Sequence, residues 1–395
     1  MARILITDGD SRSALAATRS LGRRGHEVFT AATRATSLAG VSRHSRAAFR
    51  YPDPAADSEG FVRTICEIAT RERLDLVIPM TEITTLLLTG ERARLPAGCK
   101  VPFPEQALVD RASDKAAVMA LARECGVPIP ATSVVANVAE ARAVADSLSY
   151  PAVIKPARSR VRVNSGWLST GVEYAANPAD LIRRLEALHP ATFPMLLQER
   201  VAGPGVGIFA CYDRGVSVAQ FSHRRLREKP PSGGVSVLRE SAPLDPVASE
   251  HAHRLLRALG WHGVAMVEFK QDSRDGSLRL MEINARFWGS LQLAIDAGVD
   301  FPALLADLAL GREVTPIATY ATGVRSRWLW GDFDVLLALL FRSRARLDLP
   351  PDYPGRLRCL WEFLRFWSPG LNYEVERWDD LRPGLLEARR WFLGR

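Results

Sequence analysis

The sequence predicts an α/β fold with more than one domain, on three observations. In residues 1–110, short apolar runs alternate with stretches of helical periodicity, which is typical of parallel strands joined by right-handed helical crossovers. Two later apolar runs flank a polar turn and predict an antiparallel β-hairpin. The length of 395 residues suggests two or three domains, and 47% hydrophobic with 24% charged residues is ordinary for a globular chain.

The N-terminal region is predicted to form a parallel sheet with covering helices. We expect strands at 3–9, 26–31 and 74–80 and helices at 13–25 and 81–95. The first loop, TDGDSRS, lacks the GxGxxG pattern, so the sequence does not favour a nicotinamide dinucleotide. Thr81 and Glu82, at the carboxyl end of the third strand, could contact a small molecule, although ordinary roles at a helix start explain them more simply.

Charge and composition exclude several classes of function. The net charge is +8, but the 52 basic residues are dispersed among 44 acidic ones, so we expect no nucleic-acid partner. The five cysteines and seven histidines show no zinc-ligand spacing. The sequence shows neither a secretory signal nor an apolar run long enough to cross a bilayer. We therefore expect a reduced, cytoplasmic chain that does not enter a membrane.

Two of the five lysines stand where a cation is unfavourable or costly. Lys115 lies in the first turn of a helix predicted at 113–126, with Ser113 as its N-cap, and a cation there gains nothing from the helix dipole. Taken alone, Lys115 is simply solvated. Lys155 ends an apolar strand predicted at 150–157, where its burial is costly unless it reaches an anion or a carboxylate.

The segments after Lys155 continue the alternation of loops and strands. A hairpin-like loop is predicted at 158–171, with Ser169 and Thr170 at its end. An apolar strand at 195–203 then turns polar at Gln198 and Glu199. Neither segment identifies a ligand by itself.

A later hairpin carries the strongest chemical signal. Its two apolar strands flank an Asp275-Gly276 turn. Centring the turn on Asp275 places Glu268 directly opposite Glu282. Like charges in that position destabilise a sheet. They become sensible if a divalent cation lies between them, because Mg²⁺ takes one or two protein carboxylates beside phosphate oxygens.

The second strand of this hairpin runs into the sequence LMEINARFWGS. Alternation predicts that Glu282, Asn284 and Arg286 share one face of the strand. Met281 and Ile283 would then face the other way. Arg286 could hold a phosphate with its planar guanidinium. A solvated outer face is the alternative, but the facing carboxylates favour a Mg-nucleotide site.

In their order and spacing, these segments resemble ATP-grasp enzymes, in the branch similar to carbamoyl-phosphate synthase large subunits and carboxylate-amine ligases. The resemblance rests on SDK at 113–115, PAVIKP at 151–156, QERVAG at 198–203, MVEF at 266–269 and MEINARFWGS at 281–290. It implies a two-lobed ATP-grasp fold after a Rossmann-like domain. The implied parts are a pre-ATP-grasp domain at 1–110, a linker helix and nucleotide-binding lobe at 111–200, a metal-binding lobe at 201–315 and a Trp/Arg-rich helical extension at 316–395.

Together, the residues and the resemblance assign three groups of site residues. Those expected at ATP are Lys115, Lys155, Ser169, Thr170, Gln198, Glu199, Arg200 and Val201, the last four through the backbone of a hinge strand. Those expected at Mg²⁺ (or Mn²⁺) are Glu268, Glu282 and Asn284. Those expected to act on the transferred phosphoryl group or the substrate are Arg286, Lys155 and Arg225.

This sequence departs from the family pattern at three points. The loop after Lys155 is usually glycine-rich, but residues 157–170 contain one glycine. Phosphate contacts there are expected instead from Arg158, Ser159, Arg160, Ser169 or Thr170. The residues that follow the hinge, 202–207, include no acid to bind the ribose, and the last motif reads NAR where NPR is commoner.

Two further pairs of arginines alternate along predicted strands. Arg225 and Arg227 could contact a substrate or phosphate, or simply form a solvated basic edge. Arg325 and Arg327 could reach a substrate carboxylate. The Trp-rich segment 320–395 is expected to pack against the rest of the chain or against another subunit, which leaves a homodimer open.

The chemistry that suits these parts is ATP-dependent amide formation. A carboxylate would attack the γ-phosphorus of MgATP, and an amine would capture the acyl phosphate, which releases ADP and phosphate without a protein nucleophile. The substrates would be a small-molecule carboxylate and an amine, amino acids among them. The alternatives are a phosphotransferase acting on a small-molecule acceptor and a non-catalytic nucleotide-binding protein. The presence of both metal carboxylates counts against the last.

Overall fold

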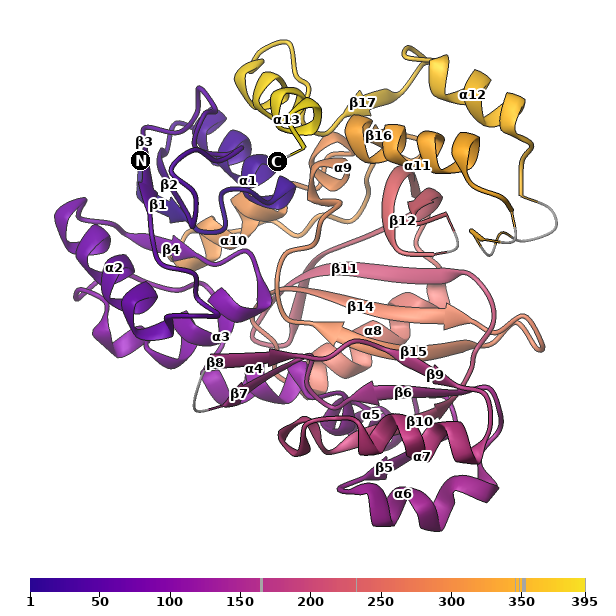
Figure 1. The fold of residues 1–395 in the computed structure, drawn as a ribbon. Coiled ribbons are helices and arrows are strands. Elements are labelled where there is room, and N and C mark those ends of the chain that lie inside the picture. The colour runs from indigo at the N-terminus through magenta and orange to yellow at the C-terminus, as the bar shows by residue number, and fades with distance from the viewer. Residues whose placement is uncertain (164–165, 232, 345, 348, 350–352, 395) are drawn as a thin grey trace.

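The computed structural model describes residues 1–163, 166–231, 233–344, 346–347, 349 and 353–394 and contains both helices and sheets (Figure 1). The described strands form a four-stranded parallel sheet near the N-terminus, a four-stranded antiparallel sheet, a separate two-stranded hairpin and a seven-stranded sheet. Short 3-10 turns occur at Arg92–Arg94, Ala145–Ser147 and Pro190–Thr192. Within the described residues, no helix is both long and apolar enough to cross a lipid bilayer.

The N-terminal sheet has the predicted parallel arrangement. Its strand order is β3 (Ala47–Arg50), β2 (Glu27–Ala32), β1 (Arg3–Ile6) and β4 (Leu76–Ile78), and its helices are α1 (Arg12–Arg23), α2 (Ser58–Arg71) and α3 (Glu82–Gly90). The central β1 is almost wholly apolar and buried, as expected for a parallel strand covered on both faces. Strand β3 and helix α2 were not predicted, whereas the other elements of this region lie where the sequence predicts them.

Two short helices connect this sheet to the next region, and they correct one prediction. Helix α4 (Gln106–Ser113) was not predicted, and α5 (Lys115–Glu124) follows it almost without a break. Ser113 therefore ends α4, and it is not the N-cap of α5. Asp114 is the N-cap, because its carboxylate accepts hydrogen bonds from the backbone N–H groups of Ala116 and Ala117 (2.9 and 3.1 Å) and adds a favourable charge at the positive end of the helix.

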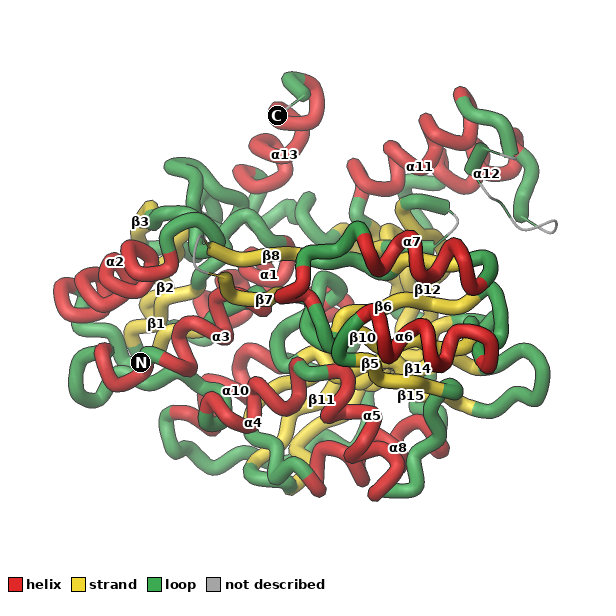
Figure 2. The backbone as a smooth tube through the Cα atoms, turned by 60° about the horizontal axis from the view of Figure 1, so that its bottom comes forward, coloured by secondary structure: helices red, strands yellow, loops and turns green. Residues whose placement is uncertain are grey.

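The antiparallel four-stranded sheet forms the lower lobe in Figure 1. Its order is β5 (Thr132–Val135), β10 (Met195–Glu199), β6 (Ala152–Pro156) and β9 (Glu173–Ala175), and α6 (Val138–Val144) and α7 (Pro178–Glu186) accompany it. The predicted loop after Lys155 is a hairpin of β7 (Arg160–Val163) and β8 (Gly166–Ser169). Its turn at 164–165 lies outside the described residues. Figures 1 and 2 both show this hairpin beside α3, away from the lobe's own sheet.

The seven-stranded sheet occupies the centre of the molecule. Its order is β15 (Leu278–Asn284), β14 (Gly263–Gln271), β11 (Gly205–Asp213), β12 (Val216–Lys229), β13 (Val235–Ala242), β16 (Arg325–Arg327) and β17 (Leu371–Tyr373). Helix α8 (Pro246–Ala258) packs on one face. On the other face, Phe209 and Trp288 belong to the same apolar core as the N-terminal sheet, together with α9 (Leu291–Asp296) and α10 (Phe301–Ala309). The N-terminal region therefore has no separate core.

The C-terminal extension packs against the rest of the chain, which is one of the two arrangements expected for it. It contains α11 (Leu329–Phe341), α12 (Arg356–Leu364) and α13 (Arg382–Phe392). A buried ion pair joins the guanidinium of Arg19 to the carboxylate of Asp380 (2.8 Å), so the extension is attached to α1. Several aromatic side chains of the extension are still exposed, including Trp367 and Trp378. The predicted boundaries at 110, 200 and 315 stay predictions.

Candidate active site

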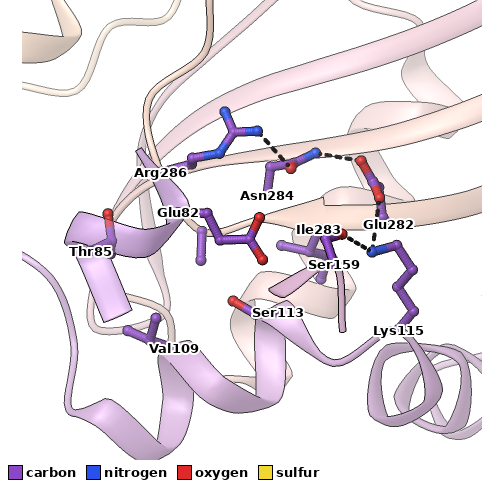
Figure 3. A pocket seen from close by; sticks show the side chains of 11 residues that line it. Glu82, Thr85, Val109, Ser113, Lys115, Ser159, Glu282, Ile283, Asn284 and Arg286 are labelled. Carbon is purple, nitrogen blue, oxygen red and sulfur yellow. Dashed lines mark hydrogen bonds and ion pairs between the residues drawn. The ribbon is translucent and has the colours of Figure 1, made fainter. Parts of the chain in front are cut away.

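A pocket lies where the β14–β15 hairpin meets the N-terminal region (Figure 3). Three parts of the chain line it: α3 with α4, the start of α5 with the loop before β7, and the end of β15. The lining residues are Glu82, Thr85, Val109, Ser113, Lys115, Ser159, Glu282, Ile283, Asn284, Ala285 and Arg286. Five of the residues predicted from the sequence to contact ATP, metal or phosphate are among them: Lys115, Ser159, Glu282, Asn284 and Arg286.

The hairpin register is the one that the sequence predicts. Glu268 on β14 lies directly opposite Glu282 on β15, so two carboxylates face each other across the ladder. The predicted strict alternation of side chains along β15 is wrong at one position, because a β-bulge lies beside this pair. Met281 is the extra residue, and its sulfur lies 3.9 Å from Nζ of Lys155, a lysine that faces the site.

Cationic side chains compensate both of these carboxylates. Lys115 Nζ lies 3.4 Å from Glu282 Oε2, and the Asn284 amide donates a hydrogen bond to Glu282 Oε1 (2.9 Å; Figure 3). Arg225 Nη2 donates to Glu268 Oε1 (2.7 Å). Burial alone would raise the pKa of Glu282, but Lys115, the Asn284 hydrogen bond, Lys155 and Arg286 together hold this pKa below its usual value. Glu282 is thus set among groups that favour its ionised form.

Lys155 lies where an apolar strand reaches the pocket region. It is the fourth residue of β6, between the buried Ile154 and Pro156. Within the described residues its ammonium has no ion pair, and its hydrogen-bond contact is the thioether of Met281. Burial lowers its pKa, and the nearby Glu282 opposes that effect. An ammonium that is partly buried without a carboxylate within ion-pair distance is a group that an anionic ligand would stabilise.

Arg286 follows the end of β15 and lies on the same side as Asn284 (Figure 3). One of its Nη atoms donates to the Asn284 side-chain oxygen (3.3 Å) and the other to the backbone carbonyl of Phe287 (2.8 Å). These bonds orient the guanidinium at the pocket wall. They leave its remaining N–H groups without a hydrogen-bond partner among the described residues, so the guanidinium can still donate to a phosphate or carboxylate.

The predicted hinge is the end of β10 and the two residues that follow it. Gln198 is buried and donates to the Thr132 hydroxyl (2.9 Å), while Glu199 accepts from the Ala131 backbone N–H (3.1 Å). Arg200 extends over the Tyr174 ring, 5.8 Å from its centroid. The Val201 carbonyl accepts a hydrogen bond from Nζ of Lys270 (3.2 Å). The side chains of Gln198, Glu199 and Arg200 therefore have structural partners, and the contact of adenine with the hinge backbone stays a prediction.

Lys270 is a site residue that the sequence reasoning missed. It connects the hinge carbonyl to β14, and its charge contributes to lowering the pKa of Lys155. A signal was present, since Lys270 follows Glu268 by two residues, and strand periodicity places residues two apart on the same face. Lys115, Lys155 and Lys270 together place three of the five lysines around the same region.

The loop after Lys155 contributes a residue that was named among five alternatives. Ser159 lines the pocket, and its hydroxyl accepts from Nζ of Lys115 (2.9 Å; Figure 3). Ser169 and Thr170 do not line it. Ser169 is exposed at the end of β8, and the Thr170 hydroxyl is buried without a hydrogen-bond partner in the described part of the chain. Contacts of Ser169 and Thr170 with ATP stay predictions.

The basic strand β12 has a bulge that separates its two arginines. Arg225 pairs with Arg239 across the ladder, but Arg227 pairs with Leu238, so Leu226 is the extra residue. The prediction that Arg225 and Arg227 share a face is therefore wrong. Arg225 contacts Glu268 in the site, whereas Arg227 forms an ion pair with the buried Asp332 of α11 (2.5 Å).

Arg325 and Arg327 also lie away from the pocket. Their ladder partners on β13 are Glu240 and Leu238, which flank Arg239 and so face the opposite side of the sheet. Arg325 forms an ion pair with Glu240 (2.6 Å), and Arg327 forms a buried one with Asp332 (2.6 Å). In this structure neither arginine faces the side of the sheet on which Arg225 contacts Glu268.

Glu82 is the N-terminal residue that the fold brings into the pocket. Asp8, at the carboxyl end of β1, accepts hydrogen bonds from the backbone N–H groups of Met80 and Thr81 (both 3.1 Å) and from the Thr84 hydroxyl (2.6 Å). These bonds fix the start of α3. Thr81 forms the capping box of α3 with Thr84, which is the structural role, and Glu82 projects into the pocket (Figure 3).

The donor set fits a hard divalent cation with a polyphosphate. Two facing carboxylates and an amide oxygen supply oxygen ligands, and Mg²⁺ characteristically binds through one or two carboxylates plus phosphate oxygens. No group of three or more His, Cys, Asp or Glu side chains in the described residues has metal-binding geometry. A cation held between Glu268 and Glu282 would therefore need a phosphate ligand to complete its shell. Lys115 and Lys155 are the cations predicted to hold such a phosphate, and their ammonium groups both act on the pKa of Glu282.

Sequence comparisons identify a matching family model and several similar proteins. Residues 192–331 match the family model described as ATP-grasp in the biosynthetic pathway with Ter operon. The chain is 27% identical over 226 residues to the N-terminal section of the carbamoyl phosphate synthase large chain of Methanopyrus kandleri, a match that covers 54% of this chain and 38% of that protein. It is 25% identical over 229 residues to the arginine-specific large chain of Lactiplantibacillus plantarum, covering 55% of this chain and 22% of that protein. The chain thus spans well under half of each relative.

Solved structures share the fold at low sequence identity. A biotin carboxylase from Campylobacter jejuni superimposes with a TM-score of 0.66 at 17% identity, covering 82% of this chain and 74% of that one. An L-amino acid ligase from Bacillus licheniformis has a TM-score of 0.58 at 17% identity, with 80% and 78% covered. These matches show that the chain shares the fold of these enzymes, and with the family match over residues 192–331 they confirm the predicted resemblance to ATP-grasp enzymes.

Proposed function

We propose that this protein is an ATP-dependent carboxylate-amine ligase that activates a carboxylate as an acyl phosphate and transfers the acyl group to an amine. The observation that carries the proposal is the meeting of Glu268, Glu282 and Asn284 with four cationic side chains at one site. The cationic residues are Lys115, Lys155, Arg225 and Arg286. Facing carboxylates suit a divalent cation, and the surrounding cations suit the phosphate groups that such a cation bridges.

Each residue has a role that follows from its position. Lys115 and Lys155 would hold phosphates of ATP, and the backbone at Gln198–Val201 would bind the adenine. Glu268, Glu282 and Asn284 would hold Mg²⁺, which when bound would offset charge on the phosphate oxygens. Arg286, oriented by Asn284 and the Phe287 carbonyl, positions the transferred phosphoryl group beside the attacking carboxylate. The rate enhancement then comes from positioning and electrostatics, without a protein nucleophile.

The relatives support this class of reaction. The superimposed proteins include an L-amino acid ligase, and two curated relatives are carbamoyl phosphate synthase large chains. A further solved structure of the same fold, with a TM-score of 0.61 at 14% identity over 81% of this chain and 80% of that one, is an ADP complex of N5-carboxyaminoimidazole ribonucleotide synthetase. We propose small-molecule carboxylates and amines, amino acids first, as the substrates.

The test follows an oxygen atom. If the carboxylate is activated as an acyl phosphate, one of its oxygens leaves with the phosphate. Amino acids labelled with heavy oxygen in the carboxylate are incubated with MgATP, and inorganic phosphate is examined by mass spectrometry. Labelled phosphate is the expected product, formed only when a competent carboxylate and an amine are present together. Unlabelled phosphate, or a stable phosphorylated product without free phosphate, would contradict the ligase and favour a phosphotransferase.

Hydroxylamine provides a second readout that needs no natural amine. It is a small neutral nucleophile that converts an acyl phosphate to a hydroxamate. The full-length protein should form hydroxamate from a competent carboxylate in the presence of MgATP, and the Glu282→Gln variant should not. Equal hydroxamate yields from both proteins would remove Glu282 from the reaction.

A further inference from the structure

A second cavity of about 350 Å³ adjoins the candidate active site. It shares Glu82 and Ser113 with the first pocket and continues between α3, α4 and the β7–β8 hairpin. Its lining residues are Glu82, Leu86, Leu87, Gly90, Glu91, Gln106, Asp110, Ser113, Arg158, Arg160, Val161, Arg162 and Trp167. A molecule in this cavity could present one end at Glu82, on the border of the two pockets. Its volume is in the range of small-molecule sites.

The wall formed by the N-terminal region is acidic. Glu82 begins α3, Glu91 follows the end of α3, and Asp110 lies on α4. Glu91 lies 3.7 Å from Arg94, and Asp110 accepts from the Gln106 amide (2.9 Å). The Glu82 carboxylate has no hydrogen bond or ion pair with any described residue, although it projects into the pocket (Figure 3). Glu82 is therefore available to a ligand cation.

The opposite wall is basic. Arg160 and Arg162 alternate along β7, and the ladder pairs Arg162 with Trp167 on β8, so these three side chains share one face of the hairpin. Arg158 forms an ion pair with Asp114 (3.3 Å). Among the described residues, neither Arg160 nor Arg162 has an ion-pair partner, and no ion pair joins the basic wall to Glu82, Glu91 or Asp110. Opposite charges thus face each other across a cavity without neutralising each other.

The hairpin is held in place as a wall of this cavity. Trp167 Nε1 donates to the Ser58 hydroxyl at the start of α2 (2.9 Å), and its ring packs against the N-terminal core. Gly166 has a φ of +132°, and a Cβ there would lie 2.9 Å from the backbone oxygen of Ala55. Only glycine combines that conformation with so close an approach. These contacts fix β8, and through the ladder they fix the arginines on β7.

We propose that this cavity binds the amine substrate of the ligase as a zwitterion, an amino acid or a short peptide, with its ammonium at Glu82 and its carboxylate at Arg160 and Arg162. The proposal rests on the proposed function and extends it by naming the class of amine. A simple amine would meet Glu82 but leave the two arginines unpaired. An anion without an ammonium would leave Glu82 facing the acyl phosphate.

Glu82 then places the nitrogen for attack. The ammonium loses a proton to the Glu82 carboxylate, and the free amine forms the C–N bond to the acyl carbon. The C–O bond to phosphate breaks, and the phosphate leaves with the bonding electron pair. The second proton lost from nitrogen goes to the departing phosphate, and the proton held by Glu82 passes to solvent.

Binding to the full-length protein tests the proposal directly. Isothermal titration calorimetry, in the presence of a non-hydrolysable MgATP analogue, is carried out with the standard amino acids and with Ala-Ala and Ala-Gly. The tightest zwitterion is compared with its N-acetyl form and with its carboxamide. We expect each capped form to bind about tenfold to a hundredfold more weakly, the loss typical of one hydrogen bond to a charged group. Equal binding of capped and uncapped forms, or no binding by any zwitterion, would overturn the proposal.

Two variants locate the binding to this cavity. Glu82→Gln and the double variant Arg160→Gln/Arg162→Gln should each weaken the tightest zwitterion by about tenfold or more. Arg142→Gln is the matched control, because Arg142 is exposed on α6 and pairs with Glu186 away from both pockets. Should Glu82→Gln fail to fold, the hairpin double variant decides the matter alone. Wild-type affinity in the double variant would overturn the assignment.

Hydroxylamine separates this proposal from the proposed function. It needs neither an ammonium site nor a carboxylate site, so the Arg160→Gln/Arg162→Gln variant should lose zwitterion binding while it still forms hydroxamate. If these variants weaken zwitterion binding, the cavity assignment is supported even when the wild type forms no hydroxamate. In that case only the proposed ligase chemistry is contradicted. Loss of hydroxamate formation in the double variant would instead place the hairpin arginines at the nucleotide and overturn the amine assignment.

Discussion

Two groups of glutamates in this protein have opposite electrostatic environments. In the candidate active site, Glu282 faces Glu268, and Lys115, Lys155 and Arg286 outweigh the effect of burial, so the pKa of Glu282 is lowered. In the C-terminal extension, burial and then the neighbouring Glu387 raise the pKa of Glu376 to about 7. Both carboxylate oxygens of Glu376 are buried without a hydrogen-bond partner among the described residues.

The difference shows what distinguishes a ligand site from a structural acid. Glu268 and Glu282 lie opposite each other, an arrangement that is unfavourable in an ordinary sheet, yet cations from β12, α5 and β6 surround them. Glu376 gains no such compensation and accommodates its burial by holding a proton more tightly. The pair that we propose as metal ligands, Glu268 and Glu282, is therefore distinguished by the cations that distant elements place around it.

The largest expected effect is a loss of turnover when either Glu268 or Glu282 of the candidate active site is replaced. Glu282→Gln or Glu268→Gln should lower turnover by about a thousandfold, because each removes a metal ligand and misplaces the phosphoryl group. Steady-state ADP release measures the loss. Circular dichroism should show an unchanged fold, and Glu67→Gln, on the exposed face of α2, should keep full activity. Normal turnover in both active-site variants would rule out the metal assignment.

The second prediction concerns the C-terminal extension and predicts a gain in the stability of the folded protein. Glu376→Gln should leave turnover unchanged and stabilise the protein by about 3 kcal/mol above pH 7, since the wild type pays for an ionised, buried carboxylate there. The wild-type pKa is higher in the folded than in the unfolded state, so wild-type stability falls as the pH rises from about 4.5 to about 7.

The difference between variant and wild type should therefore vanish below pH 4.5, where Glu376 is protonated in both states. Urea unfolding at pH 4.5 and pH 8 measures it, with Glu67→Gln as the control. A stability difference that does not change with pH would show that Glu376 is ionised in the folded protein and would remove the contrast between the two groups.

A third prediction separates charge from shape at Lys155. Lys155→Ala should weaken binding of MgATP by about tenfold to fiftyfold, because an ammonium at the phosphate is lost, and Lys155→Arg should weaken it less. Equilibrium binding of a fluorescent ATP analogue provides the affinities. If all three proteins bind the nucleotide equally, Lys155 is a structural residue of β6 and does not contact ATP.

The smallest expected effect tests the bulge at Leu226. Arg225→Gln should lower turnover by about tenfold, because Glu268 loses its cationic partner. Arg227→Gln should leave turnover unchanged and lower thermal stability, since its ion pair with the buried Asp332 lies on the opposite side of the sheet. Similar losses of turnover in both variants would mean that the two arginines act on the same side.

Features that depend on nearby residues in the chain could be predicted from the sequence. The opposition of Glu268 and Glu282 follows from one turn signal and strand periodicity, and the structure has that register. The parallel N-terminal sheet follows from alternating apolar runs in the same way. Lys155 is conspicuous because an ammonium at the end of an apolar strand is costly wherever the strand lies.

Tertiary packing decided the remaining features of the site. The bulges at Met281 and Leu226 reverse predicted facings, since one extra residue shifts a period of two. Lys115 meets Glu282 only after α5 packs on β15, and Glu82 reaches the pocket because Asp8 fixes the start of α3. The sequence by itself determined the ATP-grasp fold and the opposition of the two carboxylates that we propose as metal ligands. Only packing between segments far apart in the chain decided which charges surround them, because strand periodicity carries no information about what lies across an interface.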